Sequence, residues 1–313
     1  MILGRHLVTV HVKETSLKSL TRAWKEHRVM YLFVTPSVIL SISFFVIPFL
    51  HNLIISFCNW NIITNNGKFL GLENYIRIFT DKIFLSSILT TTQYTIFVVP
   101  FLLFFGLLFA LIVNDSNLRG NSLFQMIYFI PWVIPWLTAG LIWRFLYNDL
   151  YGPLNYLLIH FRFIEKPILF LSTKMTAMAS VILVCIWKTA GYNMVILLAG
   201  LKSIPEQVYE AAAIDGASGW KRFISITIPL IRSSIALMVI MAVVGSYLAF
   251  DHFWIVTRGA PSHETETILT WLYQTSFFRF RLGEGAAMSV VLLAITGIFA
   301  VIQVRAFNLL KLK

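Results

Sequence analysis

The stretch Glu210-Ala211-Ala212-Ala213-Ile214-Asp215-Gly216-Ala217-Ser218 decides how this 313-residue chain is interpreted. It is polar and helix-forming, and it interrupts a sequence that otherwise consists almost entirely of apolar segments. Four such segments precede it and two follow it. A short helical hairpin held between two membrane helices is well suited to pass force to a soluble partner.

The composition indicates an integral membrane protein. The chain is 58% hydrophobic and only 12% charged, and its mean hydropathy is +0.78, whereas soluble domains are about 25% charged. The net charge of +11 fits Lys and Arg residues that flank membrane spans better than a nucleic-acid surface, so we expect membrane lipid and no nucleic acid as a partner. The two cysteines, Cys58 and Cys185, have no disulfide or metal-ligand spacing.

Six segments approach the ~20 apolar residues that cross a bilayer. They cover approximately residues 29–57, 86–113, 123–147, 175–201, 235–256 and 285–307. The pattern predicts an all-α polytopic membrane protein. The first segment is too long for a signal-peptide core and no small-residue cleavage site follows it, so we expect it to remain as a span. An even number of spans places both termini on one side.

The distribution of Lys and Arg predicts which side that is. The N-terminal tail, residues 1–28, carries Arg5, Lys13, Lys18, Arg22, Lys25 and Arg28. We therefore expect cytoplasmic termini, and a cytoplasmic loop over residues 203–229 within a membrane domain of residues 29–313. In the tail, Leu17, Leu20 and Trp24 share one face of a possible helix opposite a basic face. This pattern suits a helix lying on an anionic membrane surface, and a frayed basic tail is the alternative.

The third span contains Phe129-Ile130-Pro131-Trp132-Val133-Ile134-Pro135-Trp136. The two prolines are four residues apart, and each removes a backbone hydrogen bond. Kinked or broken membrane helices are tolerated where neighbours or a water-filled cavity satisfy the exposed carbonyls. The motif therefore predicts a helix that lines a pathway, with a simple packing kink as the alternative.

Polar side chains inside the fourth and fifth spans are candidates for a solute site, because an ionisable group at membrane depth should face protein or a polar cavity. The candidate substrate-binding residues are Trp187, Lys188, Thr189, Tyr192, Asn193, Ser246, Tyr247 and Phe250. Aromatic faces beside hydroxyl, amide and ammonium donors suit a sugar ring. In the alternative interpretation, Lys188 forms a structural pair with Asp251 and the aromatics belong to the membrane interface.

The polar stretch itself predicts a helical hairpin. Residues 206–215 read as one helix, which begins after Pro205. Gly216 permits a tight turn or a close backbone approach, and Ser218 can cap a second helix from residue 219 to about residue 224. Pro229 marks the entry into the next span.

These residues resemble the signature loop of permease subunits in binding-protein-dependent ABC importers, which reads Glu-Ala-Ala, three residues, Gly, nine residues, then Ile-x-Leu-Pro. Here Ile228 stands for the usual Leu before Pro229. The flanking runs Ala199-Gly200-Leu201, Ser203-Ile204-Pro205, Phe250-Asp251 and Gly71-Leu72-Glu73-Asn74-Tyr75 resemble the branch of maltose and glycerol-phosphate permeases. The sequence Thr257-Arg258-Gly259-Ala260-Pro261 departs from the Gly-Gly-Pro usual in that family.

The resemblance implies a type I ABC importer permease of six transmembrane helices in a bacterial or archaeal cytoplasmic membrane. It implies a second homologous permease, two ABC ATPase subunits that hold ATP and Mg, and an extracytoplasmic solute-binding protein that delivers a sugar or oligosaccharide. The ATPase-coupling residues would be Glu210, Ala211, Ala212, Asp215, Gly216 and Ala217. By position, Tyr192 matches the ligand-contacting part of the maltose permease, whereas Cys185, Lys188, Ala242 and Gly245 differ.

Two other classes of protein are disfavoured. An ion-coupled secondary transporter of a polar solute should carry acidic residues at mid-membrane, where Asp251 is the single candidate. A membrane-embedded enzyme would need a cluster of His, Cys or carboxylate side chains, whereas His252 and His263 are isolated in sequence, so we expect no catalytic residues. The chain has no Gly-x-x-x-x-Gly-Lys-Ser/Thr sequence to hold nucleotide phosphates, so any ATP must be hydrolysed by a partner.

The topology predicts opposite labelling of two introduced cysteines. In a background without Cys58 and Cys185, Ser172→Cys should react with a membrane-impermeant thiol reagent in intact cells, and Ser16→Cys should react only after the cells are opened. Labelling is measured by mass shift of the protein. Reaction of Ser16→Cys in intact cells would overturn the orientation.

Overall fold

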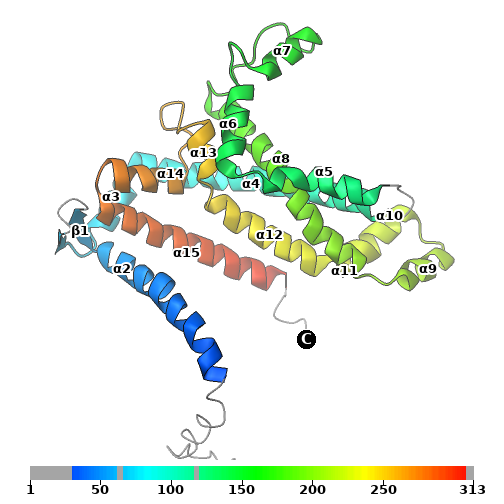
Figure 1. Ribbon diagram of the computed structural model, residues 1–313, viewed down its shortest axis with the longest axis horizontal. Helices are drawn as coiled ribbons and strands as arrows, with labels where there is room; N and C mark the ends of the chain where they lie inside the picture. Colours follow the sequence, from blue (N-terminus) through cyan, green and yellow to red (C-terminus); the bar gives the residue numbers. More distant parts are fainter. Residues whose placement is uncertain (1–29, 62–65, 116–119, 308–313) are drawn as a thin grey trace, which may run out of the picture. The chain divides into compact units, whose positions relative to one another are not determined.

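The computed structural model describes residues 30–61, 66–115 and 120–307, and these residues form mostly helices (Figure 1). The expected interfacial helix of the tail lies outside the described residues. The chain divides into two compact units, Met1–Ile54 and Ile55–Lys313.

The first unit ends in a membrane-length helix. Residues Met30–Ile55 form one apolar helix of 26 residues, which includes η1 (Ile42–Val46) and α2 (Ile47–Ile55). At about 1.5 Å per residue this helix exceeds the ~30 Å hydrocarbon core of a bilayer. Its apolar side chains, such as Phe44 and Phe45, are exposed, as a lipid-facing helix requires. The expected span over residues 29–57 is confirmed for its described part.

Three further spans are confirmed as long apolar helices in the second unit. They are α4 (Lys82–Asn114), α8 (Lys174–Lys202) and α15 (Leu282–Ala306). Helix α4 packs against α8, and α12 (Arg232–Tyr247) packs against α4, α8 and α15. Within residues 30–61, 66–115 and 120–307, four helices thus meet the length and hydropathy of a span, or up to six when each of two bent helix pairs is taken as one span.

The third span is broken rather than continuous. Helix α5 (Asn121–Val133) and α6 (Trp136–Leu146) meet at an angle of 93°. Ile134 between them has an extended backbone, because the helical region is disfavoured for a residue before proline and Pro135 has no N–H to continue the helix. The expectation of a kinked or broken helix at the prolines is therefore confirmed.

The fifth span differs from the expected residues 235–256. Helix α12 ends at Tyr247, and a separate short helix, α13 (Asp251–Val256), follows three non-helical residues. The carbonyl of Ala249 in this interruption accepts a hydrogen bond from Thr267 Oγ1 at 2.8 Å, so a distant loop replaces the missing helical partner. This long-range contact is the reason that the hydropathy pattern alone overextends the span.

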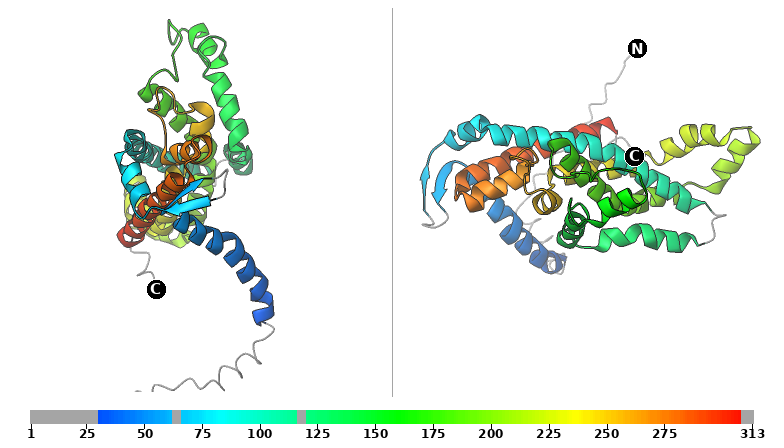
Figure 2. Two further views of the ribbon diagram at one scale, coloured as in Figure 1. Left: turned by 90° about the vertical axis from the view of Figure 1, so that its left-hand side faces the viewer. Right: turned by 90° about the horizontal axis from the view of Figure 1, so that it is seen from above.

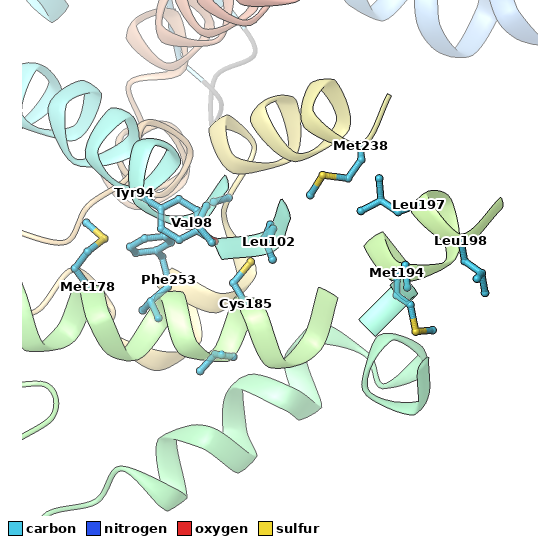
Figure 3. Close-up of a cluster of buried hydrophobic side chains, with 14 of the residues drawn as sticks. Tyr94, Val98, Leu102, Met178, Cys185, Met194, Leu197, Leu198, Met238 and Phe253 are labelled. Carbon is cyan, nitrogen blue, oxygen red and sulfur yellow. The ribbon is translucent and has the colours of Figure 1, made fainter. Parts of the chain in front are cut away.

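Apolar side chains from four helices form the main core (Figure 3). The labelled members include Tyr94, Val98 and Leu102 of α4, Cys185, Met194 and Leu197 of α8, Met238 of α12, and Phe253 of α13. A second cluster joins Tyr247 to Phe84, Trp271 and Met288, and it fixes α12 to α4, α14 (Ile268–Tyr273) and α15. Helix α14 continues into the short η3 (Gln274–Phe278).

The segments after the first span and after the third span, residues 58–85 and 148–174, contain small ordered elements. Strands β1 (Cys58–Asn61) and β2 (Asn66–Phe69) form an antiparallel hairpin, followed by α3 (Glu73–Thr80). The buried Asn74 side chain donates to the carbonyls of Ser56 and Cys58, both at 2.9 Å. The second loop contains α7 (Pro153–His160), in which the Asn155 side chain exchanges two hydrogen bonds with the backbone of Ile168.

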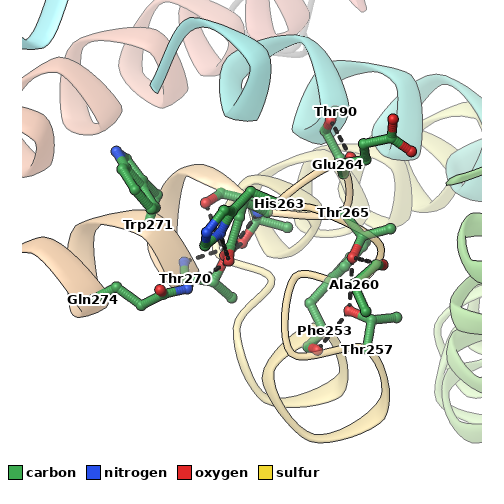
Figure 4. A network of polar contacts seen from close by, with 12 residues as sticks. Thr90, Phe253, Thr257, Ala260, His263, Glu264, Thr265, Thr270, Trp271 and Gln274 are labelled. Carbon is green, nitrogen blue, oxygen red and sulfur yellow. Dashed lines mark hydrogen bonds and ion pairs between the residues drawn. The ribbon is translucent and has the colours of Figure 1, made fainter. Parts of the chain in front are cut away.

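The loop after α13 is held by a network of threonines and one buried carboxylate (Figure 4). Glu266 accepts hydrogen bonds from Thr270 Oγ1 and Gln274 Nε2, both at 2.5 Å. Gly259 has a φ of +79°, and a Cβ there would lie 2.0 Å from Glu266 Oε1. Glycine at position 259 is therefore required, whereas Ala260 is accommodated where the family usually has a second glycine.

Helices α5 and α8 approach each other so closely that only glycine fits between them. A Cβ on Gly191 of α8 would lie 1.9 Å from the backbone oxygen of Tyr128 on α5. Since backbone atoms of two packed helices cannot yield as a side-chain end does, the first half of the broken span is fixed on α8.

Gly191→Ala should therefore destabilise the protein, because overpacking of a well-packed contact costs about 1–3 kcal/mol. The melting temperature in detergent micelles should fall. The matched control is Gly297→Ala on α15, where a Cβ would meet no atom within 4 Å and alanine favours the helix by up to ~1 kcal/mol. Equal melting temperatures for Gly191→Ala and the unmodified protein would contradict this contact.

Candidate coupling hairpin and solute cavity

The polar stretch forms a helical hairpin. Helix α9 (Glu206–Ile214) begins after Pro205. It ends at Ile214, one residue earlier than expected, and Asp215 is its C-cap. Gly216 has a φ of +74°, and the N–H of Ala217 donates to the carbonyl of Ala212 at 2.9 Å. This left-handed glycine is a common way to end a helix and to satisfy its last carbonyls.

The second arm of the hairpin is short and capped. Helix α10 (Gly219–Arg222) begins after Ser218, whose hydroxyl accepts a hydrogen bond from the N–H of Lys221. It continues through η2 (Phe223–Thr227) and α11 (Ile228–Leu230) into α12, with a bend of 68° between residues 219–230 and α12. Figure 2 shows this hairpin at the end of the second unit opposite β1 and β2.

The two faces of the hairpin differ in exposure. Ala212 is buried, and the Tyr209 hydroxyl lies 3.0 Å from Thr227 Oγ1, so these contacts join the two arms. Of the six expected coupling residues, Glu210, Ala211, Asp215 and Gly216 are exposed, and Ala217 is half-buried. Ile214 and Trp220 are 87% and 71% exposed. These two exposed apolar side chains make the hairpin a candidate surface for a protein partner.

A cavity of about 370 Å³ lies where the broken third span meets α4, α8 and α12. Its lining consists of Tyr94, Leu102, Trp132, Trp136, Cys185, Thr189, Tyr192, Asn193, Met241, Ala242, Gly245, Ser246, Leu248, Ala249, Phe250, Asp251 and His252. The volume lies within the range of roughly 300–1,000 Å³ that is usual for small-molecule sites, and a mainly apolar wall with a few polar groups is typical of them.

Five of the eight candidate substrate residues contribute to this lining, namely Thr189, Tyr192, Asn193, Ser246 and Phe250. The other three point elsewhere among the described residues. Trp187 packs edge-on against Trp143 at 5.6 Å between ring centroids. Tyr247 is buried in the second core cluster, and its hydroxyl lies 3.1 Å from Thr92 Oγ1.

Lys188 is buried behind the cavity wall rather than exposed in it. Its ammonium donates to the backbone carbonyls of Pro131 at 3.3 Å and Trp132 at 3.0 Å, and also to that of Ile134. The alternative expectation of a Lys188–Asp251 pair is wrong, since Lys188 forms no ion pair among the described residues. Its ammonium group donates its hydrogen bonds to carbonyl groups of the broken span instead.

The most prominent wall residues were missed at the sequence level. The Trp132 ring stacks on Tyr192 at 4.3 Å, and the Trp136 ring stacks on His252 at 4.6 Å. His252 Nε2 also lies 2.9 Å from the Tyr94 hydroxyl. The available signal was the repeated Pro-Trp pair at residues 131–132 and 135–136, because Trp132 lies in the last turn of α5 before the break and Trp136 begins α6 directly after Pro135.

The cavity offers a solute flat aromatic rings with a small set of hydroxyl, amide and carboxylate groups. The hydroxyls of Thr189 and Ser246 donate to backbone carbonyls within their own helices, at 2.7 Å each, so their oxygens can accept hydrogen bonds from a solute. Asp251 contributes an exposed carboxylate. Within the part of the chain that the structure describes, no Lys or Arg side chain lines the cavity.

A second, polar hollow of about 550 Å³ lies between α3 and the start of α15. Three of its charged side chains, Arg77, Arg281 and Glu284, form ion pairs. Arg77 pairs with Glu73 at 2.6 Å and with Glu284 at 3.5 Å, and Arg281 also pairs with Glu284. The hydrogen bond that Arg77 donates to the Glu73 carboxylate raises the pKa of Arg77 above its ordinary value. These pairs link α3 to α15, so the hollow has a structural explanation.

The chain belongs to the family described as "Binding-protein-dependent transport system inner membrane component", whose model matches residues 82–310. A probable ABC transporter permease of Bacillus subtilis, YurN, is 30% identical over 279 residues, which cover 89% of this chain and 95% of the relative. The trehalose/maltose transport system permease MalF of Thermococcus litoralis is 30% identical over 285 residues, which cover 90% and 94% of the two chains.

Solved structures show the same fold. A bacterial ABC transporter involved in import of the acidic polysaccharide alginate contains a chain that superimposes with a TM-score of 0.81, at 20% identity, over 93% of this chain and 98% of that one. A complex of the alginate transporter with an alginate-bound periplasmic protein gives a TM-score of 0.80. The protein is therefore a multi-pass permease subunit of the type I importer fold, a transport component and not an enzyme. Family membership favours this function over an ion-coupled secondary transporter.

Proposed function

We propose that the chain conducts a sugar or oligosaccharide through a pathway formed with a second permease, and that the 370 Å³ cavity is its part of the solute site. The observation that carries this proposal is the aromatic wall of the cavity, where Trp132, Trp136, Tyr192 and Phe250 lie beside Ser246, Thr189 and Asn193. Sugar rings have apolar faces that stack on aromatic side chains and hydroxyl rims that exchange hydrogen bonds. The sugar-transporting relative agrees with this chemistry.

The assembly follows from the family. We infer two ABC ATPase subunits, with ATP and Mg bound by them, on the cytoplasmic side, and a solute-binding protein on the opposite face. In this arrangement the membrane is the bacterial or archaeal cytoplasmic membrane, and both termini are cytoplasmic. The alginate-bound periplasmic protein in the related complex supports the binding-protein partner.

The hairpin has a direct mechanical route to the cavity. Helix α8 runs from the cavity residues Thr189 and Asn193 to Lys202, and α9 follows after three residues. The other arm leads into α12, which carries Ser246. We infer that the exposed face of α9 docks on an ATPase subunit, so that movement of the ATPase displaces α8 and α12 and reshapes the cavity between them.

Transport should depend on ATP and on the binding protein. Proteoliposomes that contain this chain, its partner permease and its ATPases should take up one of three labelled probes, maltose, trehalose or a uronate disaccharide. Uptake should require internal ATP and external binding protein, and should persist when the proton and sodium gradients are dissipated. Uptake by this chain alone, driven by an ion gradient, would overturn the proposal.

The turn of the hairpin provides a sharp test of coupling. Gly216→Val places a β-branched residue at a φ of +74°, where the new Cβ meets no atom within 4 Å. The cost should therefore be backbone strain of about 1–2 kcal/mol, confined to the docking surface. ATPase co-purification and ATP-driven uptake should both fall, while membrane abundance is retained.

The matched control is Gly219→Ala in the same hairpin. A Cβ at Gly219 also meets no atom within 4 Å, and Gly219 has no positive φ, so this variant should couple normally. Normal co-purification and uptake for Gly216→Val would show that the turn does not position the docking surface.

A further inference from the structure

The break in the third span leaves backbone carbonyls without helical partners. The last carbonyls of any helix lack an N–H donor four residues later. Here the shortage of N–H donors is greater than at an ordinary helix end, because Pro135 has no N–H and Ile134 is not in the helical conformation. Unsatisfied carbonyls are costly at membrane depth, where water is scarce. Something must therefore replace the missing donors at residues 131–134.

Lys188 supplies those donors from the neighbouring helix. Its Nζ donates to the carbonyls of Pro131, Trp132 and Ile134, and an ammonium group has three N–H donors in total. The Lys188 residue is only 2% exposed. All of its hydrogen-bonding capacity is thus used within the protein, and none is left for a solute.

The same ammonium contacts both tryptophans that flank the break. It lies 4.9 Å from the ring centroid of Trp136 and 5.6 Å from that of Trp132, distances at which a cation is attracted to an aromatic face. Trp132 belongs to α5 and Trp136 to α6. One cation therefore connects the two halves of the broken span and the two rings that form the cavity wall.

The surrounding contacts make this arrangement rigid. Gly191, one helical turn after Lys188, brings the backbone of α8 against that of α5. Tyr192, which like Gly191 belongs to α8, stacks on Trp132 of α5. His252 of α13 stacks on Trp136 of α6. The Lys188 ammonium is at the centre of these contacts, where it can fix the angle between α5 and α6.

We propose that Lys188 is a positioning residue that caps the broken third span and sets the place of Trp132 and Trp136 in the solute cavity. It contacts the wall and not the solute. The proposal rests on the proposed function in one respect, which is that this cavity is the solute pathway. The capping of the break by Lys188 does not depend on which solute the importer carries.

The test measures the shape of the cavity without a sugar. In a chain without Cys58 and Cys185, Gly245→Cys serves as the reporter, because Gly245 lines the cavity and a Cβ there meets no atom within 4 Å. The probe is a trimethylammonium-ethyl methanethiosulfonate, applied to membrane vesicles that contain the complete importer. The rate of labelling reports access to the aromatic wall.

Lys188→Met and Lys188→Gln should raise the labelling rate roughly tenfold, because charge-assisted hydrogen bonds to the break are lost and the wall loosens. Lys188→Arg keeps a buried cation with several donors and should stay within about threefold of the parent. Lys174→Met removes the same charge from the first turn of the same helix and should leave the rate unchanged.

Each outcome decides the proposal. If Lys188→Met does not reach the membrane, Lys188→Gln, which retains an amide donor, provides the measurement. Parental labelling of an assembled Met or Gln variant would overturn the positioning role. Parental labelling together with lost ATP-driven uptake of the probe sugar would instead assign Lys188 to the solute. Failure of the unmodified importer to transport any sugar would refute the proposed function and leave the labelling result intact.

Discussion

The cavity depends on one constraint, which is that a membrane helix broken at Pro135 must have its carbonyl groups satisfied inside the protein. Lys188 of α8 meets this constraint with three hydrogen bonds to the carbonyls of α5 and the break. The 93° turn between α5 and α6 brings Trp132 and Trp136 to the same hollow.

The same helix that closes the break also connects the cavity to the hairpin. Helix α8 packs against α4, α5 and α12, and a Cβ on Gly200 near its end would lie 2.8 Å from the Cβ of Ser234 at the start of α12. The two helices that flank the hairpin are therefore in close contact where they leave it. A displacement of the hairpin must act on both, and both carry residues of the cavity lining.

The charge of the cavity follows from the role of Lys188. A mid-membrane ammonium in the sequence suggests a binding site for an anion or a hydroxyl group. In the structure its protons are directed at carbonyls and its charge at two aromatic rings. What remains for a solute on this chain is aromatic surface, hydroxyl oxygens, the Asn193 amide and the Asp251 carboxylate.

The sequence alone determined the membrane class, the positions of most spans and the hairpin, because hydropathy, proline and glycine act locally: the φ of +74° at Gly216 and the cap at Ser218 are properties of adjacent residues. Tertiary structure decided where the fifth span ends, since a hydroxyl from Thr267 replaces the helical partner of Ala249. It also decided that Lys188 faces the break while Tyr192, one turn later, faces the cavity. These outcomes depend on which helix lies beside each residue. The hydropathy of a segment is the same whether its helix is capped by adjacent residues or by a side chain 54 residues away in the sequence.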